Sequence, residues 1–180
     1  MDNMFKDLLK PNHTTHLLST RIPGTRKGSS EPAYLHSVRV GESLSRHGYP
    51  QDVVLGGYLH DIIEDGEATP QELACLGYSA RTIALVLLAS HDQNVEHRDA
   101  RWVKMVAALI DMADADAWAI KVADITDNLR GCRLMSPDRP KFLRFVKGPL
   151  MRELTEGIVK RALWEELDEV VEEGLKQECL

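Results

Sequence analysis

The chain has 180 residues, 43% of them hydrophobic, and a formal net charge of −6. This length allows one domain with a hydrophobic core, and the acidic balance argues against a surface that binds the backbone of a nucleic-acid polymer. The three cysteines form no CxxC pair, no secretory signal pattern is seen and the strongest apolar run is too short for a bilayer; we therefore expect a cytoplasmic protein with free thiols and no membrane partner.

The predicted elements are helices throughout the chain. Residues 1–20 are expected to form one or two short helices with an apolar side made by Met4, Phe5, Leu8 and Leu9. Residues 21–31 are basic and rich in Gly and Ser, which predicts a loop that either folds over a phosphate or serves as a flexible connector. Helical spacing of apolar residues then predicts helices near residues 33–47, 51–64, 70–76, 79–90, 98–113, 115–135 and 139–177.

Local signals mark the ends of some of these helices. Thr69 before Pro70 predicts an N-cap with proline in the first turn, and Gly148-Pro149 predicts a break or kink in the last segment. No segment alternates as a strand does, and no Gly-rich nucleotide fingerprint occurs. We therefore expect an all-α protein, one helical bundle over residues 1–180, whose C-terminal helix is a packing element that could also reach a second subunit.

The most informative stretch is the sequence HDIIED at residues 60–65. The apolar run before it predicts a buried helix that would carry His60 and Asp61 into the interior, where an unpaired charge is costly. On a helix, Glu64 and Asp65 would share a face with Asp61, and carboxylates that close repel one another. A cation would remove this repulsion, so the stretch suggests a metal site; an exposed acidic helix end is the alternative.

Two distant residues complete a candidate ligand set. His36 lies at helical spacing from apolar residues, and Asp124 lies among the apolar residues of its segment, with Asn128 one turn further along. A lone carboxylate on an apolar face needs a partner. Taken alone, His36 fits an ordinary core or surface histidine. Together with His60 and Asp61, these residues form a two-His, two-carboxylate set that suits a divalent ion such as manganese, iron or zinc.

The order H…HD…D resembles the HD superfamily of metal-dependent phosphohydrolases. Within it, HDIIED and KVADITDN at residues 121–128 resemble the hydrolase domain of RelA/SpoT-type proteins and their small stand-alone relatives, including the metazoan SpoT homologue. Those proteins carry HD-x-x-ED and a later K-L-A-D-x-x-x-N, and Arg26 and Lys27 match the basic pair before their first histidine. The resemblance covers about residues 26–130, with packing helices expected at about 139–177.

This resemblance implies hydrolysis of a phosphate ester or pyrophosphate with one divalent metal ion; Mn²⁺ is favoured, and Fe²⁺, Zn²⁺, Co²⁺ and Ni²⁺ are alternatives. The implied metal ligands are His36, His60, Asp61 and Asp124. Glu64 or Asp65 would orient or deprotonate the attacking water. Asn128 would bond that water or a sugar hydroxyl, and Arg26 and Lys27 would hold the terminal phosphates.

Three functions remain open at this point. The first is a (p)ppGpp-like 3′-pyrophosphohydrolase acting on a small-molecule nucleotide. The second keeps the site and changes the substrate to another nucleotide or phosphorylated metabolite. The third is a catalytically silent nucleotide-binding module, against which the complete ligand set argues. Residues 89–94, ASHDQN, stand where the full-length stringent enzymes have a Thr-Lys-Leu sequence, and this departure bears on the nucleotide more than on the metal.

Overall fold

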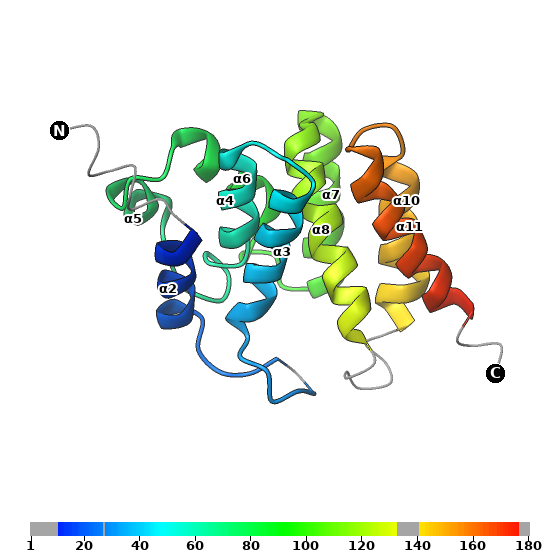
Figure 1. Cartoon of the computed structure of the whole chain (residues 1–180), viewed down its shortest axis with the longest axis horizontal. Helices are drawn as coiled ribbons and strands as arrows, with labels where there is room; N and C mark the ends of the chain where they lie inside the picture. Colours follow the sequence, from blue (N-terminus) through cyan, green and yellow to red (C-terminus); the bar gives the residue numbers. More distant parts are fainter. Residues whose placement is uncertain (1–10, 27, 133–140, 177–180) are drawn as a thin grey trace.

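The structure is a computed structural model that describes residues 11–26, 28–132 and 141–176. All the regular secondary-structure elements in these ranges are helices, which confirms the expected all-α class (Figure 1). In chain order the elements are α2 (Pro11–Arg21), α3 (Tyr34–Arg46), α4 (Gln51–Leu59), α5 (Pro70–Cys75), α6 (Ala80–Ala89), α7 (Arg98–Met112), α8 (Ala115–Gly131), the π-helical segment η2 (Leu143–Lys147), α10 (Gly148–Thr155) and α11 (Arg161–Lys176).

Helix α8 lies at the centre of the molecule. It contacts α3, α4 and α6 on one side and α10 and α11 on the other, and Figure 1 shows it between these two groups. Residues 117–126 are all buried, as expected for a helix covered on nearly every side. A polar residue in this stretch is therefore placed in the interior by the packing of five other helices.

Helices α3 and α4 approach each other closely because glycines face the contact. A Cβ atom at Gly41 would overlap the ring of Tyr58, and one at Gly57 would overlap the side chain of Leu44. Without side chains at these two positions the backbones come nearer than larger residues would allow. This close approach brings the histidine of α3 beside the histidine that follows α4.

The helix expected over residues 51–64 ends earlier, at Leu59. The chain continues through turns in which the Asp65 amide donates to Asp61 and the Gly66 amide donates to Ile62. The Ile62 carbonyl also accepts from Ala68, which pulls the chain out of the helical path. The HDIIED stretch is therefore a tight turn after a buried helix rather than the continuation of that helix.

The C-terminal half breaks at a different place from the one expected. Gly148 begins α10 directly after η2, and Pro149 lies in the first turn of α10, where a missing N–H costs nothing. The actual break follows Thr155, and Gly157 adopts a left-handed φ of 72° there, a conformation that favours glycine. Residues 133–140 lie outside the described ranges, as do the apolar residues expected to form an N-terminal helix side, Met4, Phe5, Leu8 and Leu9.

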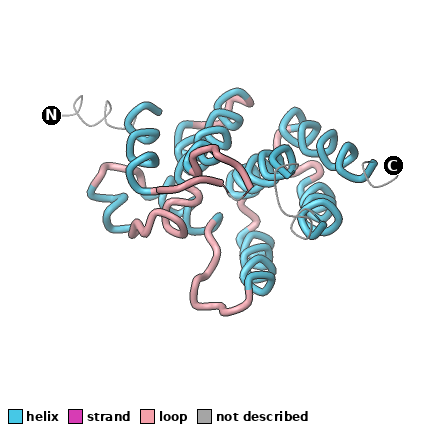
Figure 2. Tube along the Cα trace, turned by 90° about the horizontal axis from the view of Figure 1, so that it is seen from below, coloured by secondary structure: helices cyan, strands magenta, loops and turns pink. Residues whose placement is uncertain are grey.

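Loops gather at one end of the helices. A loop was expected over residues 21–31, and the described residues 22–26 and 28–33 lie outside helices, with an isolated bridge between Thr25 and Pro32. Figure 2 shows loops crossing this face in front of the helices. Thr69 caps α5 as predicted, because its hydroxyl accepts from the Glu72 amide. Among the helices of the described residues, none has the length and apolar character needed to cross a membrane.

Candidate metal centre and active site

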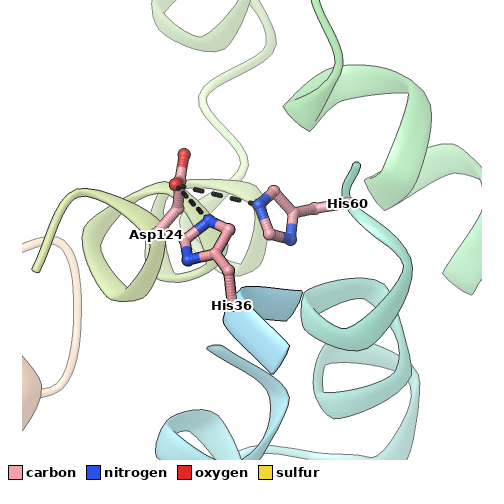
Figure 3. A group of neighbouring side chains, drawn as sticks. All are labelled: His36, His60 and Asp124. Carbon is pink, nitrogen blue, oxygen red and sulfur yellow. Dashed lines mark hydrogen bonds and ion pairs between the residues drawn. The ribbon is translucent and has the colours of Figure 1, made fainter. Parts of the chain in front are cut away.

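Three buried side chains from three separate parts of the chain converge on one point. His36 comes from α3, His60 directly follows α4, and Asp124 comes from α8 (Figure 3). An oxygen of Asp124 lies 3.2 Å from His36 Nε2 and 3.7 Å from His60 Nε2. One potential ligand atom from each residue lies within 4.8 Å of the others. The sequence expectation that these residues meet is thus matched by the geometry.

Hydrogen bonds on the outer ring nitrogens orient both histidines. His60 Nδ1 donates to the Gly57 carbonyl at 2.8 Å, which leaves Nε2 directed at the cluster. His36 Nδ1 lies 2.7 Å from an Asp127 oxygen and 3.3 Å from the Arg26 guanidinium. Arginine can only donate, so Nδ1 cannot both accept from Arg26 and donate to Asp127. The shorter contact identifies Asp127 as its partner, and the two Nε2 atoms face the same volume.

Asp61, the fourth expected ligand, lies at the edge of this cluster. Its carboxylate oxygens lie 3.2 Å from His60 Nε2 and 3.7 Å from His36 Nε2. Its side chain is 27% exposed, against 9% for Asp124. Asp61 is therefore beside the two imidazoles but on the side nearer to solvent, and the tightest group is the three buried residues.

Lys121 supplies a buried positive charge to the cluster. Its ammonium lies 2.6 Å from the second oxygen of Asp124 and donates to the Ala89 carbonyl at 3.3 Å. Burial by itself raises the pKa of Asp124, but the charge of Lys121 and the neighbouring histidines outweigh it and hold that pKa well below its usual range. Asp124 is thus an anion that shares one oxygen with Lys121 and presents the other to the imidazoles.

The charges of the cluster fit a divalent cation. Burial lowers the pKa of His36, but the hydrogen bonds that its ring donates to Asp124 and Asp127, together with the charge of Asp61, outweigh burial and raise that pKa to about 9. A proton then occupies the place where a cation would sit, and binding a cation would displace it. His60 Nε2 is buried and has no hydrogen-bond partner in the described part of the chain. Two imidazole nitrogens with carboxylate oxygens suit a divalent first-row ion, so this cluster can hold one.

Asp127 forms a second layer behind the cluster, and the sequence analysis did not identify it. It accepts from His36 Nδ1 and from Arg39 Nε at 2.6 Å, and Arg39 in turn binds Glu31 at 2.7 Å. Burial raises the pKa of Asp127, but these two donors outweigh it and lower the pKa to about 2. Its spacing of three residues from Asp124 places both on one helical face, but this spacing does not indicate that Asp127 meets His36.

Arg26 and Asn128, expected to bind substrate, both reach the cluster. The Arg26 guanidinium donates to the Asn128 side-chain oxygen at 2.8 Å and lies 3.2 Å from Asp127. The Asn128 amide nitrogen donates to Asp124. Both side chains are thus held in place from within the protein before any substrate arrives. Lys27, the other half of the expected basic pair, lies outside the described residues.

Glu64 and Asp65 are adjacent in sequence but have different surroundings. Glu64 accepts from the His91 backbone amide at 2.7 Å, from the His91 ring at 3.0 Å and from the Gln93 amide at 3.3 Å. Asp65 reaches the surface, but neighbouring atoms exclude part of the water around its carboxylate. This partial burial and the charges of Asp61 and Glu64 raise its pKa. These contacts distinguish Glu64, a carboxylate fixed by three donors, from Asp65, a carboxylate whose own pKa is raised.

A cavity of about 1100 Å³ opens beside the cluster and includes Glu64, Asp65 and His91 in its wall. The wall of this cavity also includes Arg98, Arg101, Trp102, Phe142 and Lys147. The Lys147 ammonium lies 5.2 Å from the centre of the Trp102 ring and 5.6 Å from that of Phe142. Burial, then the charge of Lys121, lowers the pKa of Lys147 to about 8. The cavity wall therefore combines carboxylates and imidazoles with basic and aromatic side chains.

Curated proteins with similar sequences include guanosine-3′,5′-bis(diphosphate) 3′-pyrophosphohydrolases. The chain is 30% identical over 122 residues to the bifunctional (p)ppGpp synthase/hydrolase SpoT of Escherichia coli. It is 28% identical over 124 residues to a guanosine-3′,5′-bis(diphosphate) 3′-pyrophosphohydrolase of Vibrio cholerae. These matches cover 64% and 66% of the chain, which spans only 17% of the length of either relative. No protein-family model matches the chain. The expected similarity to SpoT-like proteins is confirmed.

Solved structures share the fold. A metazoan ortholog of SpoT, described as hydrolysing ppGpp and acting in starvation responses, superposes with a TM-score of 0.72 over 96% of both chains at 19% identity. A Listeria monocytogenes protein superposes with a TM-score of 0.62 over 76% of this chain and 90% of its own, at 20% identity. At these identities the superpositions establish the fold, and they confirm the helical bundle expected from the HD resemblance.

Proposed function

We propose that this protein is a metal-dependent phosphohydrolase that removes the 3′-diphosphate of a (p)ppGpp-like nucleotide. The observation that carries the proposal is the convergence of His36, His60, Asp61 and Asp124 beside a cavity whose wall also carries basic residues. The similarity to named 3′-pyrophosphohydrolases supports the choice of substrate. A nucleotide with phosphates on two ribose positions needs cationic groups at two places, and this cavity offers them.

The four converging residues would hold the ion, which we propose to be Mn²⁺, with Fe²⁺, Zn²⁺, Co²⁺ and Ni²⁺ as alternatives. When bound, it would neutralise charge on the phosphate oxygens and supply water activation. His36 and His60 are already oriented for this task by Asp127 and the Gly57 carbonyl. A ligand whose outer nitrogen is fixed in this way keeps its lone pair on the metal side.

Asp65 is the base in this proposal. A carboxylate with a raised pKa is better suited to accept a proton from water, and Asp65 has that shift whereas Glu64 is held by three donors. Arg26 and Asn128 line the same cavity and would contact the substrate phosphate or sugar, with Lys27 as a second phosphate contact. Asp65, Arg26 and Asn128 thus all line the cavity beside the cluster.

A second candidate keeps the site and changes the substrate to another nucleotide or phosphorylated metabolite. It is favoured by one observation: His91 and Gln93, within the segment that departs from the stringent enzymes, both line the cavity. A change in that wall would alter which base or sugar fits, while leaving the ligand set intact.

A product assay on a nucleotide panel tests the proposal. Manganese-loaded protein should release diphosphate from ppGpp faster than it releases any product from the matching 5′-diphosphate or 5′-triphosphate. The matched control is Asp61→Ala protein, which should cleave none of them. Phosphate release from simple 5′-nucleotides with no reaction on ppGpp would reject the first function in favour of the second.

A further inference from the structure

His91 is a titratable side chain in the cavity wall that the functions above do not use. It follows α6 in a loop whose first residue is anchored to the metal centre, because the Ser90 hydroxyl contacts the Val86 carbonyl at 2.8 Å and the His60 carbonyl at 3.2 Å. The His91 side chain is 24% exposed and lines the cavity together with Asp65. The loop that carries His91 thus begins beside the backbone of His60, and His91 itself lies in the cavity wall.

The contacts of His91 leave one ring nitrogen available. Its Nδ1 lies 3.0 Å and 3.1 Å from the two oxygens of Glu64, and its backbone amide also donates to Glu64 at 2.7 Å. A carboxylate accepts and cannot donate when ionised, so Nδ1 carries a hydrogen. In the described part of the chain no hydrogen bond involves Nε2. When a carboxylate binds one ring nitrogen of a histidine and the other ring nitrogen is free, the imidazole is oriented for proton transfer through the free nitrogen.

We propose that His91, oriented by Glu64, is the general acid that protonates the leaving oxygen of the substrate. This inference rests on the proposed function, because cleavage of a 3′-diphosphate must expel the ribose 3′ oxygen. An alkoxide is a poor leaving group, and a positioned acid lowers the barrier to its departure. Glu64 offsets the charge of the protonated ring.

The hydrolysis step is balanced with Asp65 as proton acceptor and His91 as proton donor. The oxygen of water forms a bond to the inner phosphorus of the 3′-diphosphate while its proton passes to Asp65. The bond between that phosphorus and the 3′ oxygen breaks, and the electron pair stays on oxygen. That oxygen takes the proton from His91 Nε2. The products are a diphosphate and a free 3′-hydroxyl, and Asp65 and His91 return to their starting states by exchange with solvent.

Several charged groups near this loop are already engaged. Asp92 binds Lys104, and Gln93 accepts from Arg101 at 2.7 Å. Lys121 donates to the Ala89 carbonyl two residues before His91, but its charge is paired with Asp124. Among the residues near the loop, His91 is the group that combines a fixed orientation with a free proton-carrying atom.

The test compares two substrates that differ in their leaving atom. One is ppGpp, and the other is its analogue with sulfur in place of the bridging 3′ oxygen, which leaves as a thiolate and needs no proton. His91→Asn and His91→Ala are measured on both under single-turnover conditions with manganese. Asparagine retains an N–H where Nδ1 stands, so it still donates to Glu64, but it has no equivalent of Nε2. Lys104→Ala removes an exposed partner of the same loop and is the matched control.

Both His91 variants should cleave the oxygen substrate about 100-fold or more slowly than the wild type and cleave the sulfur substrate at nearly the wild-type rate. They should retain the wild-type metal content, and Lys104→Ala should cleave both compounds normally. A wild-type rate of His91→Asn on the oxygen substrate would show that His91 only positions Glu64 and would overturn the inference. Equal losses on both substrates would overturn it as well. A wild-type protein that cleaves neither compound would instead overturn the proposed function and this inference with it.

Discussion

The candidate site has a buried side and an open side, and the two are built differently. On the buried side His36, His60 and Asp124 come from, or directly follow, packed helices and are each less than 10% exposed. On the open side Asp65 and His91 come from a turn and a loop. Helix packing therefore sets the positions of the candidate ligands, and individual hydrogen bonds set the positions of the candidate proton carriers.

This difference has an energetic reason. A buried charge is costly unless it is paired and hydrogen-bonded, and the buried carboxylate of Asp124 has such a partner in Lys121. Side chains near solvent carry a smaller penalty, so Asp65 can keep a raised pKa without unfolding the protein. Changes on the buried side should therefore affect stability and metal binding together, whereas changes on the open side should affect only the rate.

The largest effect is expected from Asp124→Ala. Removing this carboxylate leaves the Lys121 ammonium buried without its anion, which should lower the free energy of unfolding by about 3–5 kcal/mol, and metal binding should be lost. Chemical denaturation and elemental analysis measure the two effects. Asp65→Ala is the control, and it should change neither. A variant at Asp124 with normal stability and a full metal content would remove the distinction between the two sides.

The second test is on the open side and compares Asp65→Asn with Glu64→Gln. Asp65→Asn should lower turnover by roughly 100- to 10,000-fold, the usual range for a lost general base, with metal content and stability unchanged. Glu64→Gln should also lower turnover, through the loss of its hold on His91. Turnover of both variants is measured with saturating manganese. Normal turnover in both variants would mean that the two carboxylates are only an acidic helix end with no catalytic role.

A smaller effect, on metal affinity, is expected from Asp127, which binds the candidate ligand His36. Asp127→Asn replaces the anion that orients His36, and the loss of such a partner should weaken metal affinity about 10- to 100-fold. Glu31→Gln is the matched control, because Glu31 reaches His36 only through Arg39 and Asp127. Metal titration monitored by calorimetry compares the two variants. Equal affinities in Asp127→Asn and wild type would show that helix packing alone orients His36.

The smallest effect concerns Lys147 in the cavity wall and its dependence on pH. The pKa of Lys147 is about 8 in the folded protein, below its ordinary value, so between these two values the unfolded chain binds more protons. Burying the charged Lys147 lowers the free energy of unfolding, and this loss is present in full below pH 8. As the pH rises above 8 the ammonium loses its proton in the folded protein, so the loss shrinks and the free energy of unfolding should increase. Urea unfolding of wild type and Lys147→Met is compared at several pH values. A stability difference that does not change with pH would contradict this.

Much of the fold could be predicted because its signals are local. The helix starts at Gln51, Pro70 and Ala80 follow from a preceding proline, a Thr cap and a Ser cap. The break near Gly148 was wrong because Pro149 is compatible with the first turn of a helix. Local rules allow a break at a proline, and whether it occurs depends on what packs against the segment.

The sequence by itself determined the residue types of the site. An imidazole next to a carboxylate after an apolar run, a second histidine and a carboxylate on an apolar helix face are local patterns, and they named His36, His60, Asp61 and Asp124. Their roles stay a proposal, but their spatial meeting matches what the pattern predicted.

Only the tertiary structure decided which side chains from distant parts of the chain bind the candidate ligands and the two carboxylates. Asp127 faces His36 across 91 positions of sequence, and His91 faces Glu64 across 27. Such pairs depend on how helices and loops pack, which no spacing along one segment reveals. The same packing gives Glu64 three donors and leaves Asp65 exposed. One of two adjacent carboxylates is thereby fixed by donors from a distant part of the chain, which the order of residues in HDIIED does not reveal.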